Sequence, residues 1–128
     1  MEPSDLKDRT KAFSLRVIKL TEAIPKSRTA EVIGRQLLRS GTSVGANYRA
    51  ARRAKSAADF IHKMGIVEEE IDESAYWLEL LVEAGLVQQS KLAALMKECD
   101  EITAIVVASI KTARRTQSGK RGNRNSEI

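Results

Sequence analysis

Proline occurs only twice in this 128-residue chain, at positions 3 and 25, and none follows Pro25. A proline ring removes a backbone hydrogen bond and interrupts a helix, so its absence leaves about 100 residues in which helices can run unbroken. Aromatic residues make up 4% of the chain, whereas the helix formers Ala, Leu, Glu, Lys and Arg are abundant. No segment shows the two-residue alternation of a half-buried strand. The sequence therefore predicts an all-α protein, and its length predicts one domain.

Apolar residues recur at three- and four-residue spacing in four segments. The most informative lies between residues 29 and 55, where the spacing continues unbroken through Gly41 and Gly45. This pattern predicts one long helix and not two short ones. A glycine inside a helix costs roughly 0.5–1 kcal/mol relative to alanine, so we expect another helix to approach closely at both glycines. The predicted helices span residues 4–24, 29–55, 57–84 and 88–114.

Capping residues support these boundaries. Ser56 precedes Asp59 by three positions, as in a capping box, and Gly85 suits the left-handed position after a helix. Short connections between helices of about 25 residues favour antiparallel neighbours. The predicted fold is an up-and-down antiparallel four-helix bundle over residues 1–115.

The net charge of +5 belongs to the C-terminal region. Residues 111–128 contain six basic residues against Glu127, so residues 1–110 sum to zero. Residues 117–125 offer no apolar side chain to bury, which predicts a basic disordered tail over residues 116–128. Two interpretations stay open for this tail: a solubilising end, or an arm that binds nucleic acid without sequence preference.

Cysteine use and hydropathy bear on the compartment. The single Cys99 excludes an intramolecular disulfide and a CxxC metal site. No N-terminal apolar stretch resembles a signal peptide, and the longest apolar runs are too short to span a bilayer. We therefore expect a cytoplasmic protein with no membrane partner.

Charge reverses sharply along the chain. Residues 26–55 carry eight Lys and Arg against Glu31, and residues 59–83 carry eight acids against Lys63. On a helical wheel, Arg39, Arg49 and Arg53 fall within about 40° of Arg35, opposite the apolar set. Such a row suits phosphate binding, although an ordinary solvated face has the same pattern. The candidate nucleic-acid-binding residues are Arg35, Arg39, Arg49, Arg52 and Arg53, with Arg114, Arg115, Lys120, Arg121 and Arg124 toward the tail.

The acids of the 57–84 helix face away from its apolar set. Antiparallel pairing brings Arg39 level with Glu73, and Arg35 level with Glu79. The same opposition of charge could instead join the positive helix of one subunit to the negative helix of the next, in a heterologous contact that closes into a ring. The candidate subunit or interhelix contacts are Glu69, Asp72, Glu73, Glu79 and Glu83.

Patterns for catalysis and metal binding are weak. A di-iron bundle needs Glu-x-x-His on two helices, and this chain has one histidine, His62. By spacing, Cys99 is a core position, and Tyr76-Trp77 is more typical of packing than of base stacking. No phosphate loop, nucleophile elbow or zinc pattern is present. We predict no catalytic, metal-binding or cofactor-binding residues, no cofactor and no enzymatic activity.

The segment from Leu37 to Tyr48, followed by Asp59-Phe60-Ile61 and by Glu70 to Leu81, resembles the bacterial four helix bundle protein family. This family is also called the 23S rRNA intervening-sequence protein family. The resemblance covers nearly the whole chain except the tail. Many relatives carry Asn-x-x-Glu-Gly, whereas here Arg49 stands two residues after Asn47, which makes the helix more basic.

The resemblance implies a bundle that assembles into a ring, typically a homopentamer, with no established enzymatic activity. A related bundle, the accessory variability protein of diversity-generating retroelements, is similar in shape. The resemblance to this bundle implies RNA or DNA, and a reverse transcriptase or another protein, as partners. Two hypotheses follow: binding of the nucleic-acid backbone through the basic residues, or an interaction scaffold whose charged faces serve subunit assembly. A third, an enzyme, lacks convergent polar groups in the sequence.

Overall fold

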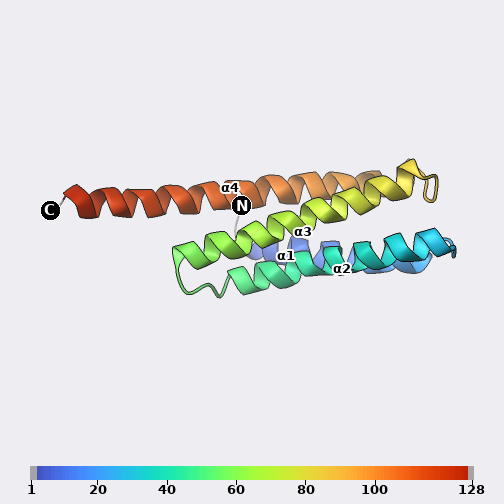
Figure 1. Ribbon diagram of the computed structural model, residues 1–128, viewed down its shortest axis with the longest axis horizontal. Coiled ribbons are helices and arrows are strands. Elements are labelled where there is room, and N and C mark those ends of the chain that lie inside the picture. The colour runs from blue at the N-terminus through green and yellow to red at the C-terminus, as the bar shows by residue number, and fades with distance from the viewer. Residues whose placement is uncertain (1–2, 127–128) are drawn as a thin grey trace.

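The computed structural model describes the backbone of residues 3–126 and the side chains of residues 6–119. Within these residues the chain forms four α-helices and no strand: α1 (Pro3–Ala23), α2 (Arg28–Ala51), α3 (Ala57–Glu83) and α4 (Gln89–Ser126). Each helix packs antiparallel to the next along the chain, and α1 closes the bundle against α4 (Figure 1). The predicted all-α, up-and-down four-helix bundle is confirmed.

Side-chain caps begin the second and third helices. The Ser27 hydroxyl accepts a hydrogen bond from the Ala30 amide at 3.1 Å, which caps α2. The Ser56 hydroxyl accepts from the Asp59 amide at 3.1 Å, and the Asp59 carboxylate accepts from the Lys55 amide at 3.1 Å. This reciprocal pair confirms the predicted start of α3.

The end of α2 differs from the sequence prediction, which places it near residue 55. The helix ends at Ala51, and the amides of Arg53 and Ala54 donate to carbonyls three residues earlier, at 3.1 and 3.0 Å. These tighter bonds close the last turn of α2. The Lys55 amide is then free to cap α3, so the same few residues cannot also extend α2.

The core runs the length of the bundle and is filled from all four helices. The largest fully buried side chains include Phe13, Leu37, Met64, Ile71 and Ile102. Cys99 is 1% exposed and belongs to this core, as its spacing predicts. Ser74 donates to Ser40 at 3.0 Å in the buried α2–α3 contact, and this polar pair fixes the register of the two helices.

Two of the three glycines inside α2, Gly41 and Gly45, lie against α1. A Cβ atom built on Gly41 would stand 2.9 Å from both Cγ atoms of Val17, too close for any real side chain. One built on Gly45 would stand 3.4 Å from the Thr10 carbonyl oxygen. The Ser14 hydroxyl donates to the Gly41 carbonyl at 3.2 Å across the same seam. The close helix approach predicted from these glycines is therefore confirmed.

The seam between α1 and α4 is the sparsest of the four, and a charged cluster joins it. Arg9 donates to Glu98 from two nitrogens, at 3.1 and 2.5 Å, and to Glu101 at 2.7 Å. These bonds hold the pKa of Glu98 below its usual value. The sequence gives no signal for this cluster, because its members lie about 90 residues apart and match no local pattern.

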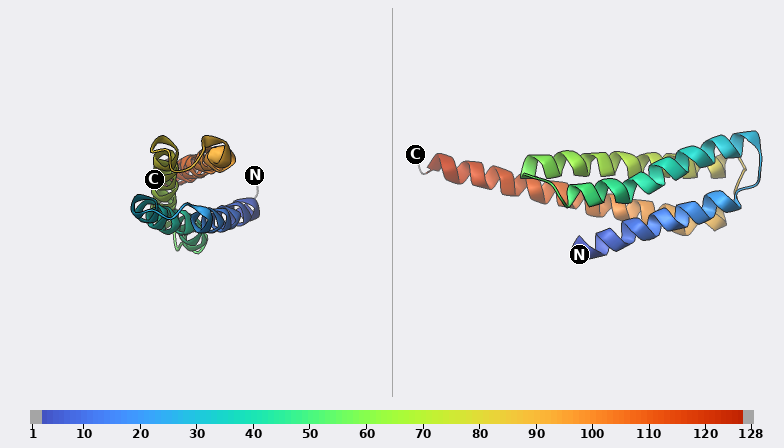
Figure 2. Two further views of the ribbon diagram at one scale, coloured as in Figure 1. Left: turned by 90° about the vertical axis from the view of Figure 1, so that its right-hand side faces the viewer. Right: turned by 90° about the horizontal axis from the view of Figure 1, so that it is seen from below.

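The last helix corrects the predicted end at residue 114 and the disordered tail predicted for residues 116–128. The backbone of α4 continues as a helix to Ser126 and extends beyond the other three helices (Figures 1 and 2). No proline occurs in it, and the Lys, Arg and Gln residues after Ile110 favour a helix, so its hydrogen-bond ladder is not interrupted. The prediction of a disordered tail rests only on the lack of apolar side chains to bury, and a helix does not require a buried face. Residues 127–128 lie outside the described part.

Candidate nucleic-acid interface

Arg39, near the middle of α2, is held by two acids of α3. Its guanidinium donates to Glu70 Oε2 at 3.2 Å and to Glu73 Oε1 in a closer contact, so the predicted Arg39–Glu73 pair is present. Trp77 Nε1 also donates to Glu73 at 3.3 Å. The hydrogen bond from Arg39 is the main reason that the pKa of Glu73 lies below its usual value. Glu73 is therefore held ionised, and the two contacts offset the charge of Arg39.

Arg35, one turn earlier, does not form the predicted pair with Glu79. Within the described residues neither side chain has an ion-pair partner. Arg35 lines a cavity on the α1 side of α2, together with Glu22 and Glu31, and so lies away from α3. The predicted register was correct, but a wheel drawn for each helix alone does not show which flank meets which neighbour.

The last turn of α2 and the connection after it carry cations with no acid opposite them. Arg49, Arg52 and Arg53 are exposed, and none forms an ion pair with a described residue. The start of α3 follows this connection, and its first acid, Asp59, already pairs with Lys63 at 3.0 Å. These three charges are therefore not neutralised within the described chain.

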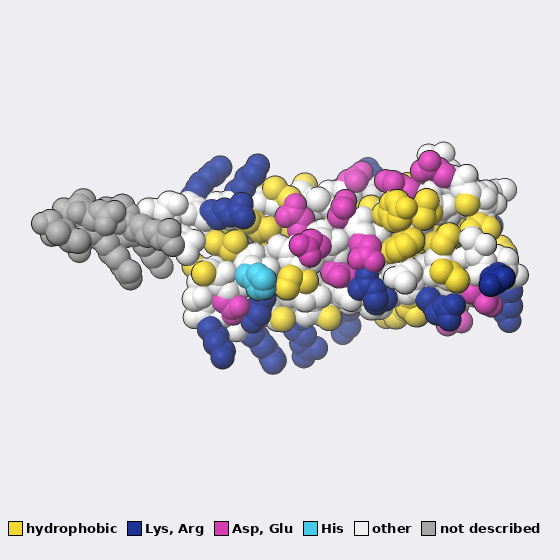
Figure 3. Space-filling view, in the orientation of Figure 1, with side chains coloured by type: hydrophobic (Ala, Val, Ile, Leu, Met, Phe, Trp, Pro, Cys, Tyr) yellow, Lys and Arg dark blue, Asp and Glu magenta, His cyan; other side chains and the backbone are white. Residues whose placement is uncertain are grey.

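The antiparallel topology adds cations from two other helices to the same end of the bundle. The start of α1, the end of α2 and the part of α4 that leaves the bundle lie together there (Figure 1). Figure 3 shows Lys and Arg side chains gathered at this end, where α4 projects. We call this surface the cationic end; it consists of Lys7, Lys11, Arg49, Arg52, Arg53, Lys55, Lys111, Arg114 and Arg115.

Sequence reasoning missed three members of the cationic end, Lys7, Lys11 and Lys111. Lys7 and Lys11 match no pattern in the sequence, and Lys111 enters it only as part of the C-terminal charge. The signal that could have found them is the topology itself, because an up-and-down bundle places the first turns of α1 beside the last turns of α2. Of the predicted tail residues, Arg114 and Arg115 are exposed on α4, while the side chains of Lys120, Arg121 and Arg124 lie outside the described residues.

The acidic face of α3 lies toward the other end. Glu69, Asp72, Glu79 and Glu83 have no ion-pair partner among the described residues. Tyr76 lies among them, 52% exposed, with its ring edge-on to Trp77 at a centroid distance of 5.1 Å. Figure 3 shows apolar side chains over the second half of α3 with acidic side chains beside them.

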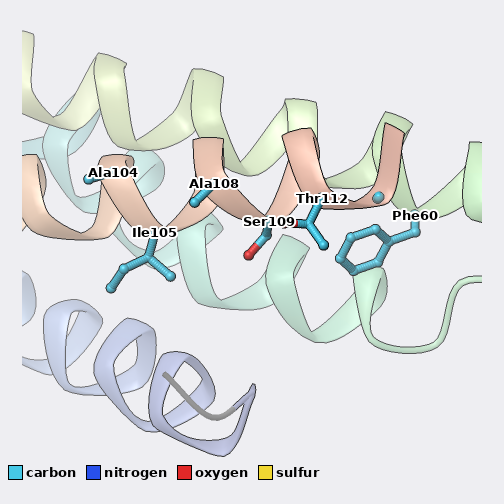
Figure 4. Close-up of a pocket in the computed structure, with 7 residues that line it drawn as sticks. Phe60, Ala104, Ile105, Ala108, Ser109 and Thr112 are labelled. Atoms are coloured by element: carbon cyan, nitrogen blue, oxygen red, sulfur yellow. The ribbon is translucent and has the colours of Figure 1, made fainter. Parts of the chain in front are cut away.

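A cavity beside α4 has an apolar lining. It encloses about 640 Å³. Figure 4 shows Ile105, Ala108, Ser109 and Thr112 along α4, with Phe60 near Thr112 at the start of α3. None of its lining residues titrates, so it offers no acid or base. Burial raises the pKa of the Cys99 thiol to about 12, which keeps it protonated and unreactive.

The described residues also contain no group of three or more His, Cys, Asp or Glu that could hold a metal ion. No helix in the described part of the chain is long and apolar enough to cross a membrane.

The fold and this surface define a small antiparallel helical bundle with a concentration of unpaired positive charge at one end. The sequence pattern of the 23S rRNA-intervening sequence protein family matches residues 3–108. The chain belongs to this family. The match ends before the projecting part of α4.

A solved structure supports the same assignment. It is the crystal structure of a protein of unknown function from the S23 ribosomal protein family of Bacteroides thetaiotaomicron. The two chains are 35% identical, with a TM-score of 0.81, and the alignment covers 87% of this chain and 99% of the other. No curated protein matches the sequence.

Proposed function

We propose that this protein is a non-catalytic, homo-oligomeric bundle that binds the backbone of RNA or DNA through its cationic end. The observation that carries the proposal is the set of unpaired Lys and Arg side chains that three helices bring together. Each phosphate neutralised by such a side chain releases condensed counterions, which drives association regardless of base sequence. The side chains concerned are Lys and Arg, which suits backbone contact more than the reading of bases.

The experiment is a titration of a short RNA duplex of mixed sequence with the full chain, at salt concentrations from about 50 to about 200 mM. We expect log K to fall linearly with log salt, by about 0.9 for each phosphate contact. A second duplex of different sequence should give the same affinity. Binding that ignores salt, or no binding at the lowest salt, would reject the proposal.

A second candidate function, an interaction scaffold without nucleic-acid binding, is favoured by the acidic face of α3. Four unpaired acids surround the exposed ring of Tyr76, and a basic helix of another subunit would complement this surface. Reversing charge in R49E/R53E separates the two functions. The first predicts loss of RNA binding with the subunit number unchanged, as measured by light scattering. The second predicts dissociation of the oligomer, in a protein that binds no RNA before or after the change.

A further inference from the structure

We propose that a hollow between α1 and α2, beside Gly45, is the seat for one phosphate group of the bound backbone. This inference rests on the proposed function and deepens it, because it assigns a defined subsite within the cationic end. The hollow encloses about 340 Å³, and its cationic lining residues are Lys7, Lys11 and Arg49.

The hollow exists because α2 carries small residues where it meets the first turns of α1. Gly45 and Ala46 both line it, and Gly45 allows the Thr10 carbonyl to approach within 3.4 Å of where a Cβ would stand. The Ser14 hydroxyl, also in the lining, is already bonded to the Thr10 carbonyl at 3.1 Å and to the Gly41 carbonyl at 3.2 Å. Tyr48 also belongs to the lining, and the charge of the hollow comes from Lys7, Lys11 and Arg49.

A second cavity on the same seam provides an internal comparison. It also encloses about 340 Å³, but it lies at the other end of the α1–α2 seam, where Glu22 and Glu31 line it together with Lys26 and Arg35. Its charges balance. No carboxylate belongs to the described residues that line the hollow beside Gly45, and its cations form no ion pair with described residues. The two cavities have similar volumes but unlike charge, so of the two only the hollow beside Gly45 suits an anion.

The arrangement of donors suits a phosphate. A guanidinium can donate two parallel hydrogen bonds to two phosphate oxygens, while each ammonium group acts as a point charge. Arg49 reaches the hollow from α2, and Lys7 and Lys11 reach it from α1, so the three charges approach from two sides. A backbone phosphodiester and free phosphate share this chemistry, and the experiment separates these two sources.

The test compares three double variants, each of which removes one Lys and one Arg. K11A/R49A removes charges of the hollow, R52A/K55A removes neighbouring charges of the cationic end, and K26A/R28A removes charges at the opposite end. In RNA titrations at about 0.1 M salt, loss of two phosphate contacts lowers affinity on the order of 50-fold. We expect this loss for K11A/R49A, a loss at least several-fold smaller for R52A/K55A, and little change for K26A/R28A.

Equal losses of RNA affinity for K11A/R49A and R52A/K55A would reject the hollow as a phosphate subsite. They would leave the proposed function intact, because binding would then follow total charge. Failure of the unmodified chain to bind RNA would instead reject the proposed function itself. Circular dichroism of each variant controls for folding.

A second measurement locates the ligand directly. NMR titration of the unmodified chain with the RNA duplex should shift the backbone amide signals of Gly45 and Ala46, and the A46E variant, which places a carboxylate at the exposed Ala46, should bind RNA more weakly. If inorganic phosphate shifts these signals and the duplex does not, the site binds free phosphate and the assignment to backbone phosphate is wrong. Absence of a shift with either probe would overturn the site.

Discussion

Arg39 and Arg49 lie on the outward side of the same helix, yet only one of them retains an unpaired charge. Arg39 contacts Glu70 and Glu73, whereas Arg49 has no ion-pair partner among the described residues. The difference arises on the neighbouring helix. The register fixed by Ser40 and Ser74 places the acidic part of α3 beside the first two-thirds of α2 and leaves the last turns of α2 beside the start of α3.

A row of arginines on a helical wheel does not show which of them are free to bind a ligand, because acids of a neighbouring helix can pair with some of them. We call the part of α2 around Arg39 the paired half, and the part from Gly45 through Arg53 the unpaired half. In the paired half, surface ion pairs contribute about 0–1 kcal/mol each and specify which helices adjoin. In the unpaired half, charges of like sign repel one another and weaken the fold slightly in the absence of a ligand. A cluster of such unpaired cations is suited to binding a polyanion from outside the chain.

The largest expected effect comes from reversing charge in the unpaired half. The R49E/R52E/R53E variant should lower RNA affinity by a factor on the order of 10²–10³ at about 0.1 M salt, because three phosphate contacts are lost. It should also make the dependence of log K on log salt shallower by about 0.9 for each contact. Titration by fluorescence anisotropy at several salt concentrations measures both quantities.

The matched control for this variant is R39E in the paired half. It should change RNA affinity far less, since the charge of Arg39 is already offset by Glu70 and Glu73. Comparable losses for the two variants would show that the distinction between the halves of α2 has no bearing on binding.

The second prediction concerns two glycines of α2, Gly41 and Gly45. Gly41→Ala should destabilise the bundle by about 1–2 kcal/mol, because the new methyl group would collide with Val17 and its strain outweighs the gain in helix propensity. Gly45→Ala meets the Thr10 carbonyl at 3.4 Å and should leave stability within about 1 kcal/mol of the unmodified chain. Urea unfolding measures both, and the reverse order would contradict this account of the α1–α2 seam.

The third prediction tests whether Arg39 can bind a phosphate once its acidic partners are removed. The E70Q/E73Q variant removes both acids that hold Arg39 and keeps the side chains almost isosteric. If Arg39 can then reach a phosphate, RNA affinity should rise by up to about eightfold at about 0.1 M salt, which corresponds to one added contact. The double variant E79Q/E83Q removes two acids that have no ion-pair partner among the described residues, and it serves as the control for the change in net charge.

Much of the fold follows from the sequence by local rules. Unbroken apolar spacing predicted α2 across Gly41 and Gly45, and the Ser56–Asp59 capping box located the start of α3. These signals succeed because hydrogen bonding and side-chain packing along one helix depend on neighbours three and four residues away. The end of α4 was missed, because a helix can continue without a buried face when no residue stops it.

The candidate site was only half predictable. Arg49 was found from the wheel, but its neighbours Lys7 and Lys11 come from another helix and match no local spacing. Conversely, Arg35 was predicted to meet Glu79 and instead lies toward α1. Both errors concern how a helix is rotated about its axis against each neighbour, and that rotation is fixed only when the four helices pack together.

The smallest expected effect is the pH dependence of the Arg39–Glu73 contact. The pKa of Glu73 is lowered in the folded state, so above the usual carboxyl pKa of 4.5 the carboxylate is ionised in both states and the contact contributes its full stability. As pH falls below 4.5, the unfolded chain takes up the proton first, and stability is lost until the folded carboxyl is protonated too. At neutral pH, R39A should reduce the free energy of unfolding by about 0.3–1 kcal/mol, since both side chains are partly exposed. The difference between R39A and the unmodified chain should then shrink as urea unfolding is repeated at successively lower pH, whereas R28A should show no such trend. A difference that is independent of pH would mean that Glu73 is not the partner through which Arg39 stabilises the paired half.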